Sequence, residues 1–217
     1  MQVVVKGQVG PRLVADGAEE EVRISRDAAQ VVQDAHGRYT ETVTRGNVFF
    51  AANQANAIFS GGLLTSVGTL TLTNPPNSGK NLAVLQADFI LQNIPTPAAA
   101  GLGQSSTAIY LMVQPYNATV VTQNVPLTVR NALLGSGPSA VGLAASGSTL
   151  ATTPVIAKYL SSFLFLSSSG GTTLVQNGGG SYDLGGSLVL TPGTALAFSS
   201  TSVITGSCAL LWEELPI

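Results

Sequence analysis

The chain has 217 residues, of which 45% are hydrophobic and only 9% are charged, and its formal net charge is −2. An ordinary soluble domain contains about 25% charged residues. Nucleic-acid binding requires clustered lysine and arginine, and this composition provides no electrostatic basis for it. We therefore expect no nucleic-acid partner.

The charged residues are distributed unevenly along the chain. Residues 1–45 hold 13 of the 20 charged residues, whereas residues 46–212 hold five. This change predicts a charged, mostly extended N-terminal arm over residues 1–45 and a β-sandwich domain over residues 46–217. The arm has no run apolar enough to bury itself, so we expect it to pack on its own domain or on a neighbour. Its start, MQVVVKGQVGPR, lacks the basic and apolar regions of a signal peptide.

Beyond residue 46 the pattern is that of an all-β protein. Apolar and β-branched runs alternate with clusters of Gly, Pro, Asn and Ser at intervals of about ten residues, which is typical of a sandwich or a barrel. In TLTLT, Leu70 and Leu72 share one face of a strand. In NLAVLQADFIL the apolar positions change parity between Val84 and Leu85, which predicts a β-bulge. Residues 95–106 and 131–153 are rich in Ala, Gly, Ser and Pro and are predicted to form long loops.

The stretch TNPPNSGKNL, residues 73–82, can be compared with the sequence pattern of a phosphate-binding loop. Such a loop has Gly, four residues, then Gly-Lys-Ser/Thr, and it opens a helix. Here Asn74 replaces the first Gly, Asn81 follows Lys80, and a strand-like run comes next. We predict the tip of a hairpin, with Lys80 as a solvated charge.

Groups suited to catalysis are scarce. His36 is the only histidine and lies in the arm, and the domain's acids before Glu213-Glu214 are Asp88 and Asp183. A retaining glycosidase needs two carboxylates about 5 Å apart, which these two would reach only by accident of folding. GGGSYD, residues 178–183, approaches a calcium repeat, but it occurs once and is predicted to be a Gly-rich hairpin loop. We expect no enzyme, no catalytic, cofactor-binding or metal-binding residues, and no cofactor.

The last strand-like run places Cys208, Leu210 and Trp212 on one face. Cys208 is the only cysteine, so no intrachain disulfide forms, and it is predicted to be a small buried residue. Glu213-Glu214 is expected at the strand exit. No apolar run approaches the roughly 20 residues of a membrane-spanning helix, and we expect no membrane partner.

Four blocks of sequence carry a family resemblance: VVVKGQVGPRLVADGAEEEVRISR, DAHGRYTETVTRGNVFF, TLTNPPNSGKNLAVLQA and ALLWEELP. With these blocks the chain resembles small β-rich virion structural proteins of tailed bacteriophages, of the capsid decoration or cement type. The resemblance implies a jelly-roll-like β-sandwich, often trimeric, with no catalytic residues to carry over. It also implies the major capsid protein and further copies of the chain, as a homotrimer, as partners. The expected location is the capsid exterior, after assembly in the bacterial host cytoplasm.

Two other functions remain open. A tail or head-fibre adaptor would share the composition. A carbohydrate-binding β-sandwich module would need exposed aromatic rings, and the candidates are Tyr110, Tyr116 and Tyr182. Trp212 lies in a core-like strand, which weakens the second alternative.

Overall fold

The computed structural model describes residues 38–53, 57–59, 66–93, 104–119, 121–135, 137–167, 173–174 and 178–217. The chain divides into two units, Met1–Thr40 and Glu41–Ile217, and almost all described residues belong to the second. Most of the predicted arm, with His36, lies outside the described residues, so its extended structure stays a prediction. At its end, α1 (Thr40–Thr44) is a single short helix.

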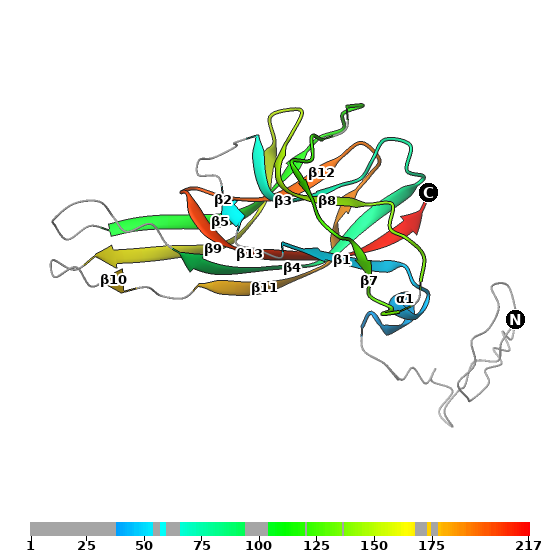
Figure 1. The fold of residues 1–217 in the computed structure, drawn as a ribbon, viewed down its shortest axis with the longest axis horizontal. Helices are drawn as coiled ribbons and strands as arrows, with labels where there is room; N and C mark the ends of the chain where they lie inside the picture. Colours follow the sequence, from blue (N-terminus) through cyan, green and yellow to red (C-terminus); the bar gives the residue numbers. More distant parts are fainter. Residues whose placement is uncertain are drawn as a thin grey trace, which may run out of the picture. The chain divides into compact units, whose positions relative to one another are not determined.

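The described strands form two antiparallel sheets that pack face to face (Figure 1). We name each sheet after a central strand. The β13 sheet consists of β1 (Val48–Ala52), β2 (Ala57–Phe59), β4 (Lys80–Asn93), β7 (Arg130–Asn131), β11 (Gly179–Leu190) and β13 (Ile204–Pro216). The β12 sheet consists of β3 (Val67–Thr73), β5 (Gln104–Gln114), β6 (Val125–Pro126), β8 (Leu143–Thr149), β9 (Val155–Ser167), β10 (Thr173–Leu174) and β12 (Ala195–Ser200).

The longer strands pair in nested order along the chain, the first with the last and so on towards the middle of the sequence. β1 pairs with β13, β3 with β12, β4 with β11, and β5 with β9. The first and third pairs lie in the β13 sheet, in the order β11-β4-β13-β1-β7, and the other two in the β12 sheet. This nested pairing is that of a double-sheet jelly roll. The prediction of an all-β, jelly-roll-like sandwich is therefore confirmed.

The main core lies between the two sheets. The β13 sheet contributes Phe49, Phe89 and Trp212, and the β12 sheet contributes Leu72 and Phe198, all of them buried. The rings of Phe49 and Trp212 stack with centroids 6.3 Å apart. Removing such large side chains from water is the main force that holds two sheets together.

The predicted face of the last strand is also confirmed. Cys208, Leu210 and Trp212 all belong to the main core. Burial raises the pKa of the Cys208 thiol well above its ordinary value.

The centre of the β12 sheet is buried on both faces. Leu70 and Leu72 face the main core, as predicted, and the threonines that alternate with them, at positions 69, 71 and 73, are buried too. A second apolar cluster lies on the outer face, the face turned away from the β13 sheet. Its members are Tyr110, Met112, Val121, Leu150, Ala195 and Ala197. Since Val121 and Leu150 lie outside the strands, the segments that contain them cover this face.

The predicted β-bulge in β4 is confirmed at Leu85. Val84 pairs with Leu188 of β11 and with Trp212 of β13, and the register of both pairings shifts between Val84 and Gln86. Leu85 has no partner in either register. The extra residue restores the alternation, so that the strand keeps an apolar inner face on both sides of the bulge.

Three loop predictions in Gly- and Ser-rich sequence are wrong, at least in part. The predicted loop over residues 131–153 contains β8, and the one over residues 95–106 ends in the first residues of β5; its remainder lies outside the described residues. In GGGSYD, residues 179–183 belong to β11 and pair with β4. These segments have weak β-propensity, and strand formation there depends on neighbouring strands that composition does not reveal.

The predicted hairpin at residues 73–82 is also wrong, although the segment is a loop and a strand follows it. β3 and β4 belong to different sheets, so the loop crosses the sandwich. Asn74 holds it, donating from Nδ2 to the carbonyl oxygens of Lys80 and Leu190, each at 2.8 Å. Because a jelly roll connects opposite sheets at this point, adjacent strand-like runs do not pair.

Candidate functional site

The two isolated acids of the domain lie on the outer face of the β13 sheet. Asp88 is opposite Ser181, and Asp183 is opposite Gln86, on the adjacent strands β4 and β11. Gln86 Nε2 donates to both carboxylate oxygens of Asp88, at 2.9 and 3.0 Å, and to Ser181 Oγ at 2.9 Å. The fold therefore brings the two acids to diagonal positions on one sheet face, although they are 95 positions apart in the chain.

The arrangement of these side chains does not indicate a metal site or a nucleophilic catalytic site. Within the described ranges, no group of three or more His, Cys, Asp or Glu side chains is placed to hold a metal ion. His36 lies outside them. The expectations that the chain is not an enzyme and that it uses no cofactor stay predictions.

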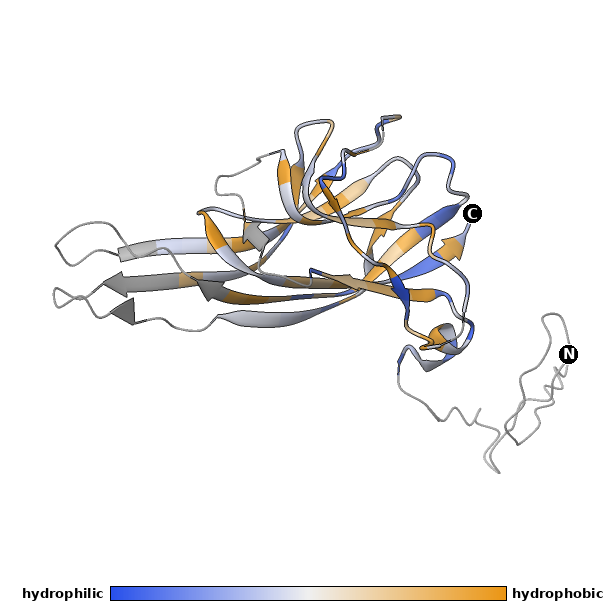
Figure 2. Cartoon of the chain, in the orientation of Figure 1, coloured by the Kyte–Doolittle hydropathy of each residue, from blue (hydrophilic) through white to orange (hydrophobic). Residues whose placement is uncertain are grey.

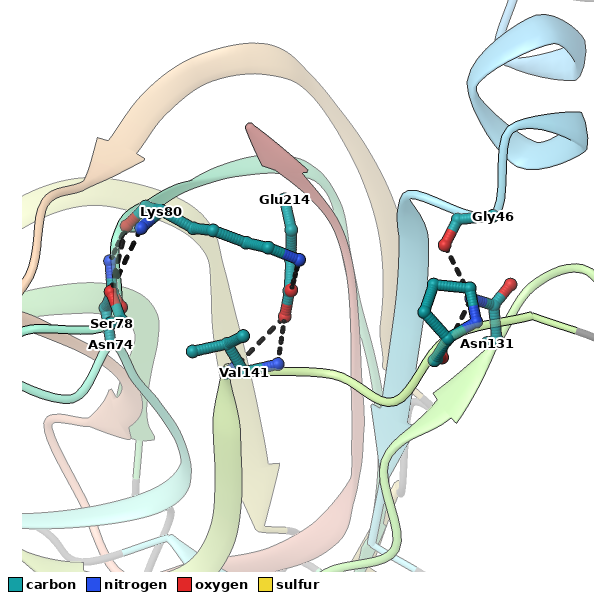
Figure 3. Close-up of polar contacts among 9 residues, drawn as sticks. Gly46, Asn74, Ser78, Lys80, Asn131, Val141 and Glu214 are labelled. Carbon is teal, nitrogen blue, oxygen red and sulfur yellow. Dashed lines mark hydrogen bonds and ion pairs between the residues drawn. The ribbon is translucent and has the colours of Figure 1, made fainter. Parts of the chain in front are cut away.

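A buried carboxylate lies at the end of β13. The Glu214 side chain is fully buried, and its Oε2 accepts an ion-pair hydrogen bond from Lys80 Nζ at 3.0 Å. Its Oε1 accepts the backbone N–H groups of Val141 and Gly142 at 2.8 and 2.9 Å (Figure 3). Three donors satisfy the charge, as a buried carboxylate requires. Glu214 thus joins β13, the start of β4 and the segment that leads into β8.

The sequence prediction about Lys80 is wrong. Its side chain is not a solvated charge but is only 29% exposed and bound to Glu214. Glu214 lies near the end of β13, as expected, but its full burial was not predicted. The alternation that turns Trp212 inwards continues to Glu214, and this signal could have placed the carboxylate in the core.

Residues 127–143 form an open groove of about 550 Å³. Its lining is Leu127, Val129, Arg130, Asn131, Leu133, Leu134, Gly135, Gly137, Pro138, Ser139, Ala140, Gly142 and Leu143. Leu127, Val129 and Ala140 also pack against the main core. Among the described lining residues Arg130 alone is charged, so the groove is suited to neutral or anionic groups.

Asn131 shapes the groove. Its Nδ2 donates to the carbonyl oxygens of Gly46 at 2.6 Å and Pro138 at 3.4 Å (Figure 3). Its Oδ1 accepts the N–H of Leu133 at 2.8 Å. Gly46 has φ +75°, and a Cβ there would lie 2.8 Å from Pro138 Cδ. These contacts, together with the Glu214 anchor at Val141, hold both ends of the lining segment. The sequence predicts a loop only from residue 131 onwards and predicts no groove there.

The tyrosines considered for sugar binding differ in exposure. Tyr110 is buried in the second cluster, so it cannot stack on a sugar. Tyr182 is partly buried and stacks on Phe89, with ring centroids 6.0 Å apart. Of these three, only Tyr116, 68% exposed, offers an open ring. Two of the three predicted candidates are therefore not available for stacking on a sugar.

Comparisons of the chain with protein-family models, with curated proteins and with solved structures find no match. In the part of the chain that the structure describes, no helix is long and apolar enough to cross a membrane.

Proposed function

We propose that the chain is a non-enzymatic structural protein of a virion, a cement or decoration protein that binds the exterior of a tailed-phage head and stabilises its lattice. The observation that carries this proposal is the neutral surface of the domain. Residues 46–212 hold only five charged residues, and blue segments are few on the described strands in Figure 2. A free domain usually stays soluble through surface charge.

Large apolar side chains add to this argument. Several are more than half exposed: Ile90, Tyr116, Val125, Leu134, Val155, Tyr159, Val203 and Ile217. Interface cores are depleted of charge, and each charge buried on assembly costs several kcal/mol of desolvation. A surface of this kind is suited to packing between subunits of a large assembly.

The second part of the proposal concerns the charged arm. Residues 1–45 bind the major capsid protein or sister subunits, while the domain forms a homotrimer and projects from the head. A protein that binds the assembled lattice but not the separated subunits stabilises that lattice by mass action. No cofactor or catalytic group is needed for this role.

The test uses heads purified from a phage whose gene for this chain has been deleted. The full chain, a chain starting at Gly46, and a full chain with the sequence of residues 1–45 scrambled are each mixed with these heads. We expect the full chain to co-sediment with the heads and raise their melting temperature, and both variants to fold but not bind.

Several outcomes contradict the proposal. No binding by the full chain refutes the cement function. Full occupancy by the chain starting at Gly46 refutes the role of the arm, and binding by the scrambled chain shows that its charge alone suffices. Electron microscopy with a labelled antibody against the chain distinguishes the head from the tail, where an adaptor would lie.

A further inference from the structure

The groove at residues 127–143 combines an apolar lining with one charge. Every residue in this range other than Arg130 is uncharged. Leu134 and Leu143 line the groove and are nevertheless 77% and 38% exposed. Hydrogen bonds to the backbone before β1 and to the buried carboxylate of β13 fix the segment that forms the groove (Figure 3). The groove is therefore preformed, and its two exposed leucines are open to an occupant.

Other charged side chains of the domain do not cancel this cation. Glu41 and Arg45 precede β1 and pair with each other at 2.7 Å. The buried carboxylate of β13 already has its own lysine. Glu213 lies on β13, and β1 separates that strand from β7, on which Arg130 lies; the acids of β4 and β11 are farther still. An occupant of the groove therefore meets a net positive charge, which favours an anionic group.

One segment of the arm matches the groove in charge and polarity. Residues 18–24 read AEEEVRI. The arm is predicted to be extended, and alternate side chains of an extended segment share a face. Ala18, Glu20, Val22 and Ile24 would then lie on one face, which carries one anion followed by two β-branched apolar side chains. The groove offers the complement, which is one cation with apolar side chains around it.

Other stretches of the arm match the groove less well. Residues 3–9, VVVKGQV, carry a lysine and no acid. Residues 10–17, GPRLVADG, are interrupted by Pro and Gly. In residues 27–34, DAAQVVQD, each acid would share its face with one alanine, one valine and one glutamine, and so has less apolar surface beside it. Residues 18–24 are therefore the best occupant that the arm provides.

We propose that residues 18–24 of one copy bind in the groove of a sister copy. Glu20 meets Arg130, and the β-branched side chains that follow it cover the two exposed leucines. This contact rests on the proposed function, in which the arm holds sister subunits, and it supplies their binding site. If every arm binds the next copy, three arms and three grooves close a ring, as a homotrimer requires. An arm bound in its own groove would link no copies.

The arm is long enough for this exchange. Residues 25–39 connect the segment to α1 and can span up to roughly 50 Å when extended, whereas a domain of this size is about 40 Å across. The groove volume of about 550 Å³ is that of a site for a few side chains. Each contact is therefore weak by itself, and closure of the ring strengthens it because the later contacts form within one assembly.

Disulfide trapping in the full chain tests this contact. The native Cys208 is buried, so introduced cysteines can be followed alone. Chains with Val22→Cys are mixed with tagged chains that carry Leu134→Cys, oxidised, and analysed on non-reducing gels and by peptide mass spectrometry. We expect a disulfide that joins positions 22 and 134 of different chains. Its yield should be at least about tenfold that of a control mixture, in which Tyr159→Cys, at a position of β9 that is 59% exposed, replaces Leu134→Cys.

The charge pair is tested in the same mixture. Arg130→Glu, added to the chain with Leu134→Cys, should lower the yield at least about threefold. Glu20→Arg, added to the chain with Val22→Cys, should then restore most of it. Arg130 is exposed, and circular dichroism checks that every variant is folded.

Three results overturn the inference. The first is a yield no higher than that of the control mixture. The second is a yield that Arg130→Glu leaves unchanged, or that the second reversal fails to restore. The third is a chain with both Val22→Cys and Leu134→Cys that still forms its disulfide within single chains at high dilution, because the arm would then occupy its own groove.

The head-binding experiment keeps this inference separate from the proposed function. A disulfide between copies that do not bind heads refutes the cement function alone. Head binding by a chain that gives no such disulfide refutes this contact alone.

Discussion

Replacing Glu214 tests whether the carboxylate anchors the segment before β8. In Glu214→Ala the N–H groups of Val141 and Gly142 lose their acceptor. Gly142 is buried and Val141 partly so. An unsatisfied buried donor costs about 1–3 kcal/mol, while the partly exposed Lys80 can turn to water and adds little. We expect a loss of about 3–5 kcal/mol in the free energy of unfolding.

Two further variants separate the hydrogen bonds from the ion pair. Glu214→Gln keeps an acceptor oxygen for both N–H groups, but an NH2 group replaces the oxygen that binds Lys80, so the ion pair is lost and we expect a loss of about 1–2 kcal/mol. Lys80→Met removes the ion-pair donor at 3.0 Å but leaves the backbone contacts. Because the buried carboxylate then lacks its cation, we expect a loss between those of Glu214→Gln and Glu214→Ala.

Urea unfolding, followed by the fluorescence of Trp212, measures these differences. With a slope of about 2 kcal/mol per molar urea, Glu214→Ala should lower the midpoint by about 2 M and Glu214→Gln by about 0.5–1 M. Measurements in dilute solution keep self-association from contributing. A loss below about 1 kcal/mol for Glu214→Ala, or a larger loss for Lys80→Met than for Glu214→Ala, would refute the reasoning.

Two other predictions follow from the same end of the domain. A Cβ at Gly142 would lie 3.0 Å from Leu82 Cδ1 and 3.1 Å from Trp212 Nε1, so Gly142→Ala should cost about 1–3 kcal/mol by urea unfolding, whereas the exposed control Ser139→Ala should cost under about 0.5 kcal/mol. Burial raises the pKa of Glu213 above its ordinary value of 4.5. The folded state therefore holds this proton more tightly than the unfolded state, and the associated stability is lost as the pH rises through the folded pKa. In melting curves from about pH 4 to pH 7, Glu213→Gln should gain stability over the original chain as the pH rises, and a constant difference would contradict this.

The parts of the fold that depend on local alternation could be predicted from the sequence. The inward face of the last strand, with Cys208 and Trp212, follows from period-two spacing alone. The bulge at Leu85 follows from a parity change within a single strand. Each of these predictions needs only a few consecutive residues, and the structure confirms both.

The parts that depend on distant residues could not be predicted. Lys80 and Glu214 are 134 positions apart, and nothing near either one indicates its partner. β8 forms in the weak strand sequence LAASGST because β3 pairs with it. The groove at residues 127–143 exists because contacts with Gly46 and Glu214 fix a segment that, from residue 131 onwards, composition marks only as a loop.

The covered outer face of the β12 sheet limits how far such molecules can aggregate. Val121 and Leu150 close the centre of that face from within the same chain, so a second molecule finds no open sheet surface there. Tyr159, opposite Tyr110 on the same face, stays 59% exposed, so only the centre is closed. At that centre the loops of the chain, and not charged side chains, keep a second molecule away from the sheet.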